Sequence, residues 1–212
     1  MSKMLCLDLS TTCTGFAVFC LETKKLLDYG FIKPNKKGMS KLSYPIKQLR
    51  VMQDLATQII HLVYKIDGFS MDGSKNHLKM ILIEEVNLHK SRMTGKTLDG
   101  LHWILLQRLA GDRDEKYEER VRYRDSDGDA GWRTRLGLKL SDMDKKVNAV
   151  HNKINKKKKK GTSDLVIINK KHLAARYVNS SLGLGFDVDQ NPNDNDIVDA
   201  IGLGLSELLT LK

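Results

Sequence analysis

Apolar and polar positions along the chain show two periodicities, one typical of strands and one typical of helices. Short apolar runs over residues 3–9, 15–21 and 28–33 predict three antiparallel strands, the first two forming a hairpin. From residue 45 to about residue 66, apolar side chains recur every three or four positions, which predicts a long helix. A near-continuous apolar run over residues 80–86 predicts a strand that is buried on both faces in the middle of a sheet.

The second half of the chain is predicted to be mostly helical. Residues 164–168 fit either a strand or the first turn of the helix after them. This order of elements predicts an α/β fold with a five-stranded mixed sheet, in which three antiparallel N-terminal strands precede parallel β-α-β units flanked by helices. The elements expected here are a helix over 98–109, a strand over 119–123, and helices over 132–138, 141–155, 170–182 and 195–209.

Length and composition indicate an ordinary globular protein. The 212 residues fit one domain spanning residues 1–212, with insertions expected near 111–131 and 152–161. No apolar run approaches the roughly 20 residues of a membrane span, and no signal peptide is evident, so we expect a cytoplasmic protein without a membrane partner. The cysteines, at positions 6, 13 and 20, form no C-x-x-C pair and are expected to be buried small apolar residues.

Positive charge is concentrated in one segment. Residues 133–176 hold fourteen Lys or Arg and three acids, whereas the whole chain has a formal net charge of +10, so the remainder is nearly neutral. Such an excess favours a polyanionic partner, although a solvated lysine-rich loop without a ligand is the alternative. The residues expected to bind the phosphates of DNA are Lys156, Lys157, Lys158, Lys159, Lys160, Lys170, Lys171 and Arg176.

Two acidic positions lie at the ends of predicted strands. Alternation places Asp8 on the same face as Cys6, so its charge would lie on a mostly apolar surface. A carboxylate there needs an ion pair, a hydrogen bond or a metal ion to offset its desolvation. An aspartate at the end of a strand can also bond its own turn, and this alternative stays open. The buried run over residues 80–86 contains Glu84 and Glu85, of which alternation should direct Glu85 away from Asp8.

A third acidic position lies in the last predicted helix. Asp196 and Asp199 are three residues apart, on one face and near the helix N-terminus. Interaction with the helix N-terminus would explain Asp196 but not Asp199, which lies deeper. If these acids converge with Asp8 and Glu84, the cluster requires cations, and oxygen ligands suit Mg²⁺ or Mn²⁺. Two such ions roughly 4 Å apart can drive phosphodiester hydrolysis, so the acids and the basic segment together indicate a nuclease.

The same acidic motifs, in chain order, resemble those of the RuvC-type Holliday junction resolvases. The matching motifs are Leu7-Asp8-Leu9-Ser10 with Thr14-Gly15, Ile83-Glu84-Glu85-Val86, and Asp196-Ile197-Val198-Asp199-Ala200. The pattern Trp132-Arg133 with Leu136-Gly137 resembles an element of the small phage-encoded branch of that family. The resemblance covers most of the chain and implies an RNase H-like fold.

The resemblance also implies an activity and a set of roles. The expected function is Mg²⁺-dependent, structure-selective cleavage of branched DNA (Holliday junctions, forks or flaps) in DNA recombination and repair, by a homodimer in the cytoplasm of a bacterial host. Asp8 would bridge two Mg²⁺ ions per active site, with Mn²⁺ as a substitute. Glu84 would bind one ion, and Asp199, together with Asp196, would bind the other. Glu85 and the two expected insertions depart from the family pattern.

Two other functions fit parts of the sequence. A non-catalytic DNA-binding protein would use only the basic segment and would tolerate replacement of the acids. A phosphotransferase of the actin and sugar-kinase type is suggested because Asp8-Leu9-Ser10-Thr11-Thr12 resembles the first phosphate loop of that fold. That fold needs a second phosphate hairpin and a glycine-rich adenosine site. Neither is evident in the sequence, so we expect no nucleotide cofactor.

Overall fold

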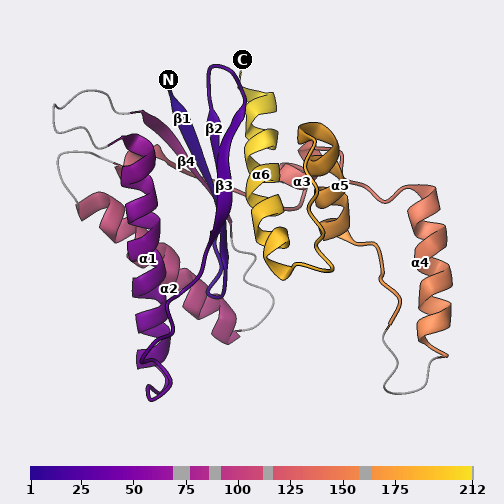
Figure 1. Cartoon of the computed structure of the whole chain (residues 1–212), viewed down its shortest axis with the longest axis horizontal. Coiled ribbons are helices and arrows are strands. Elements are labelled where there is room, and N and C mark those ends of the chain that lie inside the picture. The colour runs from indigo at the N-terminus through magenta and orange to yellow at the C-terminus, as the bar shows by residue number, and fades with distance from the viewer. Residues whose placement is uncertain (69–76, 86–91, 112–116, 158–163, 212) are drawn as a thin grey trace.

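A mixed five-stranded sheet forms the centre of the molecule, as predicted (Figure 1). The computed structural model describes residues 1–68, 77–85, 92–111, 117–157 and 164–211. The strand order is β3-β2-β1-β4-β5, with β1 antiparallel to β2 and parallel to β4. The strands are β1 (Lys3–Asp8), β2 (Thr14–Cys20), β3 (Leu26–Ile32), β4 (Leu78–Glu84) and β5 (Val121–Arg124).

Helices cover both faces of the sheet, with α1 and α2 on one side and α6 on the other (Figure 1). The alternation of β1 explains this arrangement: Leu5 and Leu7 pack in the α1/α2 core, whereas Met4 and Cys6 pack in the α6 core. The helices are α1 (Ile46–Asp67), α2 (Arg92–Gly111), the 3₁₀ helix η1 (Tyr117–Arg120), α3 (Trp132–Arg135), α4 (Asp142–Asn155), α5 (Lys170–Leu182) and α6 (Pro192–Thr210). None of the described helices is long and apolar enough to cross a membrane.

Helix α6 approaches the sheet closely because glycines line its inner face. A Cβ atom on Gly204 would lie 2.2 Å from the Phe19 ring, and one on Gly202 would lie 2.4 Å from the ring of Trp132. On the sheet side, a Cβ on Gly15 of β2 would lie 1.9 Å from the backbone oxygen of Asp196. Gly204 and Gly15 therefore bring α6 against β1 and β2, and Gly202 brings it against Trp132 of α3.

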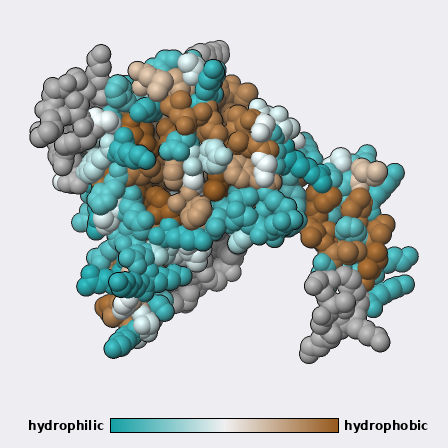
Figure 2. All heavy atoms as spheres, viewed as in Figure 1, coloured by the Kyte–Doolittle hydropathy of each residue, from teal (hydrophilic) through white to brown (hydrophobic). Residues whose placement is uncertain are grey.

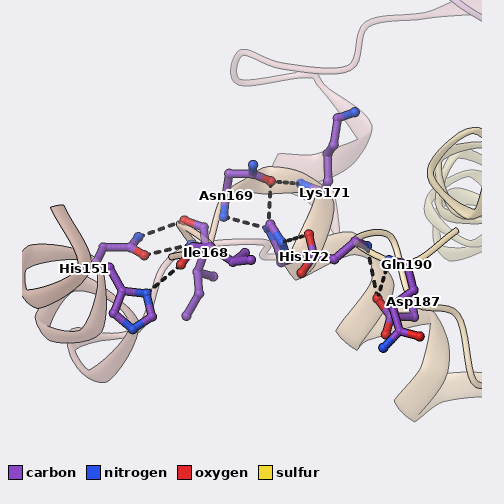
Figure 3. Close-up of polar contacts among 10 residues, drawn as sticks. His151, Ile168, Asn169, Lys171, His172, Asp187 and Gln190 are labelled. Carbon is purple, nitrogen blue, oxygen red and sulfur yellow. Dashed lines mark hydrogen bonds and ion pairs between the residues drawn. The ribbon is translucent and has the colours of Figure 1, made fainter. Parts of the chain in front are cut away.

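Helix α4 stands apart from the sheet and forms, with residues 164–169, a projecting arm (Figure 1). These residues are neither a strand nor a helical turn, because side chains of α4 satisfy their backbone groups. Asn148 bonds both the N–H and the C=O of Ile168, at 2.7 and 2.8 Å, and Asn155 does the same for Leu165. We call these paired bonds the asparagine zipper; Figure 3 shows the pair at Ile168. Nearby, His151 Nδ1 lies 2.6 Å from the Val166 carbonyl oxygen.

Two helices begin earlier than the sequence pattern predicts. Helix α2 begins at Arg92 rather than at residue 98. Helix α6 begins at Pro192 rather than at residue 195, because the side chain of Asn191 accepts a hydrogen bond from Asn193 N and proline fits the first helical position. The stripe of Leu101, Leu105 and Leu109 on α2 is buried in the α1/α2 core, and the three cysteines are buried and unbridged, as predicted.

Candidate metal centre

Three carboxylates far apart in the sequence meet at one edge of the sheet. Asp8 ends β1 and Glu84 ends β4; these strands are parallel neighbours with Leu7 opposite Ile83, so the two acids follow at the same level. Asp199 approaches from α6, which covers the face of the sheet that carries Met4 and Cys6. One carboxylate oxygen from each residue lies within 4.8 Å of the other two.

Burial makes this cluster costly when it holds only negative charge. Asp199 is 5% exposed, and burial raises its pKa to about 7, with the charge of Glu84 adding to the rise and that of Arg133 opposing it. Burial also raises the pKa of Asp8 well above its usual value, and the charges of Glu84 and Asp199 raise it further. The pKa of Glu84 is raised by burial despite the opposing charge of Arg133. The site therefore favours cations or protons.

A guanidinium group supplies part of the missing positive charge. Arg133 Nη2 donates to Asp199 Oδ2 at 2.7 Å, and Nη1 lies 3.5 Å from Glu84 Oε1. The guanidinium carbon lies 4.4 Å from the centre of the Trp132 ring, a cation–π distance. Burial lowers the pKa of Arg133, but the charges of Asp199 and Glu84 more than compensate and raise it overall. Arg133 is not among the predicted site residues; its only signal was the Trp132-Arg133 pair in the resemblance.

Two buried oxygens of the cluster lack a well-placed hydrogen-bond donor. Among the described residues, no donor meets Glu84 Oε2 or Asp199 Oδ1 in good hydrogen-bond geometry, although the side chains of Ser126 and Trp132 lie close enough to the Glu84 carboxylate to lower its pKa. Buried carboxylate oxygens normally have partners, so these two atoms are open to a ligand. The donor set consists of oxygen alone, which suits Mg²⁺ or Mn²⁺. The residues present therefore fit the expected metal ion.

Asp196 lies beside this group of three rather than within it. Its charge contributes to the raised pKa of Asp8, and burial raises its own pKa. Asn195 Nδ2 donates to its carboxylate at 3.4 Å. Burial and the neighbouring Asp196 raise the pKa of the Cys13 thiol to about 12, so this thiol stays protonated and is a poor metal ligand at neutral pH.

Glu85 points away from the cluster, as alternation requires. Its side chain is exposed, and its charge raises the pKa of Tyr123 after the larger effect of burial. Tyr123 packs on the α1/α2 side of the sheet, whereas Leu82, two residues before Glu84, packs on the α6 side. Of the two consecutive glutamates, only Glu84 therefore joins Asp8.

The residues predicted to bind DNA differ in their surroundings. Lys171 is exposed at the start of α5, and its charge lowers the pKa of both Asp196 and Asp199, so it lies close enough to influence the acidic cluster. Lys170 pairs with Asp127 at 2.7 Å, and Arg176 pairs with Asp144 at 2.7 Å, which joins α5 to α4. Lys156 and Lys157 are exposed after α4, and Lys158, Lys159 and Lys160 lie outside the described residues.

Solved structures with this architecture include RuvC from Thermus thermophilus in complex with a Holliday junction substrate. That match has a TM-score of 0.53 and 12% identity and covers 96% of this chain and 91% of the other. The chain has the RuvC fold. A second T. thermophilus RuvC structure matches with a TM-score of 0.49 and 14% identity, covering 96% of this chain and 92% of the other. No protein-family model and no curated protein matches the sequence.

The RuvC fold agrees with the RNase H-like architecture that the acidic motifs implied, including the order and direction of the strands. At 12% identity the similarity establishes the fold alone. The activity has to be argued from the carboxylates and the charges around them.

Proposed function

We propose that this protein is a divalent-metal-dependent endonuclease that cleaves phosphodiester bonds in branched DNA. The observation that carries the proposal is the convergence of Asp8, Glu84 and Asp199, with two buried carboxylate oxygens that no described residue bonds in good geometry. Two further facts support the choice of substrate. A structure with the same fold is RuvC in complex with a Holliday junction substrate, and this chain carries a formal net charge of +10.

In this proposal Asp8, Glu84 and Asp199 hold Mg²⁺, or Mn²⁺ in its place, and Asp196 supports the site from the neighbouring turn of α6. When bound, two Mg²⁺ supply an activated water and stabilise the leaving oxygen. Asp8 would be one of the residues that hold the metal, because its carboxylate lies between those of the neighbouring strand and of α6 in the cluster. The exposed ammonium group of Lys171 binds a backbone phosphate next to the acids and holds the scissile strand against them.

The substrate and assembly follow from the same resemblance. Holliday junctions are the first expected substrate, with forks and flaps as related branched forms. A homodimer would present two such sites to the two strands of a junction that are cut. The mass of the purified protein, measured by light scattering, tests this expectation independently of cleavage.

The cleavage experiment uses adjacent glutamates as a matched pair. End-labelled junction, fork, flap and linear duplex DNAs are incubated with Mg²⁺ and with the wild type, Asp8→Asn, Glu84→Gln or Glu85→Gln. Asp8→Asn and Glu84→Gln should lose cleavage but retain junction binding in Ca²⁺, whereas Glu85→Gln, which faces away, should cut like the wild type. If the Asp8 and Glu84 variants cut at the wild-type rate, the site assignment is wrong. If the wild type binds junctions without ever cutting them, a non-catalytic DNA-binding function is favoured.

A further inference from the structure

The position of Arg133 is set by the same helix that carries Asp199. Trp132, the preceding residue, is 1% exposed, and its ring fills the space that the missing Cβ of Gly202 leaves on α6. The face of this ring lies 4.4 Å from the Arg133 guanidinium. Because the Trp132 ring packs against α6, it holds the guanidinium next to Asp199. Asp199 lies on α6 about one helical turn before Gly202.

Arg133 occupies oxygen atoms that a cation could otherwise use. Its side chain is 13% exposed; Nη2 contacts Asp199 Oδ2 and Nη1 faces Glu84 Oε1, at 2.7 and 3.5 Å. The second oxygen of each carboxylate, Glu84 Oε2 and Asp199 Oδ1, is the one that no described residue bonds in good geometry. Each of these two carboxylates is thus divided, with one oxygen toward the arginine and one left for a ligand.

The charges of the cluster also favour one divalent ion beside Arg133. When all three carboxylates are ionised, they and the one guanidinium together carry two net negative charges, which a single divalent ion neutralises. A second divalent ion beside a retained guanidinium would leave the buried site with excess positive charge, and uncompensated buried charge is costly. A DNA phosphate supplies negative charge and also accepts the planar N–H fork of an arginine.

We propose that Arg133 takes the place of one of the two cations in the DNA-free protein. The DNA-free chain then binds one divalent ion, and a second binds only when the guanidinium leaves Asp199 and Glu84 for a phosphate of the substrate. This inference rests on the proposed metal site. It makes Arg133 a positioning residue that links full metal loading to the arrival of DNA, so the protein without DNA is not fully loaded.

Calorimetric titration of the DNA-free protein with Mn²⁺ tests this inference directly. The wild type should bind one ion per chain. Arg133→Gln, which removes the positive charge, should bind two ions, or one about tenfold more tightly, because a competing charge-assisted contact is lost. Arg135→Gln is the matched control: it lies on the same helix, but its side chain pairs with Glu207 at 3.8 Å, and its isotherm should equal that of the wild type.

Further measurements separate the possible failures. Arg133→Lys keeps the charge and should still bind one ion. If Arg133→Gln does not fold by circular dichroism, the number of ions bound by the wild type without and with DNA decides the question. A Ca²⁺ titration of the wild type with saturating junction DNA should give two ions per chain. Two ions in the DNA-free wild type, or an Arg133→Gln isotherm identical to that of the wild type, would overturn the role of Arg133. The metal site itself survives that result if Asp8→Asn abolishes binding. Absence of any Mn²⁺ binding to the wild type would overturn both proposals.

Discussion

At the scale of single residues, burial decides which groups can carry charge. His102 of α2 is 9% exposed, and burial lowers its pKa to about 4, so the ring is neutral in the folded protein at pH 7. Its Nδ1 lies 3.3 Å from the Tyr123 hydroxyl, and the two rings stack. The acids at the metal centre show the opposite shift from the same cause, because burial penalises the charged form of each group.

The shifted histidine makes stability depend on pH. As pH falls from about 6.5 to about 4, the unfolded chain takes up a proton that His102 in the folded chain resists, so the free energy of unfolding should fall by up to about 3 kcal/mol from this group. His102→Gln should flatten this part of the profile in urea unfolding measured from pH 4 to 7. His61→Gln, at an exposed histidine of α1, is the control for the loss of a histidine side chain. Equal slopes in all three proteins would contradict the assignment.

Among the described glycines, Gly15 leaves the least room for a side chain. In Gly15→Ala the new Cβ would lie 1.9 Å from the Asp196 backbone oxygen, so α6 or β2 must shift, and we expect a loss of about 2–3 kcal/mol of stability together with weaker Mn²⁺ binding. Gly185→Ala is the control, since its Cβ would meet no atom within 4 Å. Thermal unfolding and metal titration of both variants check this. A Gly15→Ala protein as stable as Gly185→Ala would show that the strand and helix are not in close contact.

At the scale of elements, the sequence predicts segments that are stabilised by their own pattern and misses those stabilised by another element. The strands and the longer helices follow from alternation and helical periodicity. Residues 164–168 could not be assigned, because their backbone bonds to asparagines about ten to twenty positions earlier. Asp8 and Glu84 were predicted because each ends a strand. Asp199 was predicted because it lies too deep in its helix to interact with the helix N-terminus. Arg133 was missed because its role depends on Trp132 packing against Gly202, a contact between distant elements.

Each asparagine of the zipper in the arm can be tested separately. Asn148→Ala removes the acceptor for Ile168 N and the donor to Ile168 O, so the Ile168 amide should exchange with deuterium at least ~10-fold faster. Asn155→Ala should act in the same way on Leu165. The exposed Asn152 lies on the same helix, and Asn152→Ala should leave both amides protected. Unchanged exchange in the first two variants would mean that the segment is held by other contacts.

At the scale of the whole molecule, the arm and the acidic centre differ in chemistry. Figure 2 shows hydrophobic residues gathered on the projecting arm, and on α4 Met143 and Val150 are 71% and 56% exposed. The buried acids lie at the sheet edge, whereas the basic excess belongs to the segment 133–176, which includes α4 and most of α5. Of these basic residues, Lys171 lies close enough to the acids for its charge to lower the pKa of Asp196 and Asp199.

Salt dependence measures how these lysines are used. Lys171→Gln should weaken junction binding in Ca²⁺ and reduce the slope of log K against log salt by about 0.9, the value for one lost phosphate contact. Lys25→Gln is the matched control: it lies just before β3, at the end of the sheet opposite the acids, because Asp8 pairs with Gly15 near the start of β2. Fluorescence anisotropy between 50 and 200 mM salt gives both slopes. A Lys171→Gln slope equal to that of the wild type would place the DNA elsewhere.

The spacing between Asp199 and Gly202 on α6 limits how the sequence can diverge. Each residue turns a helix by about 100°, so one residue inserted or deleted between Asp199 and Gly202 would rotate the carboxylate away from β1 and β4 while the glycine stayed seated on Trp132. Substitutions can accumulate around this stretch, but a change in its length cannot be absorbed. Related chains should therefore vary freely in the length of the arm and keep this three-residue interval fixed.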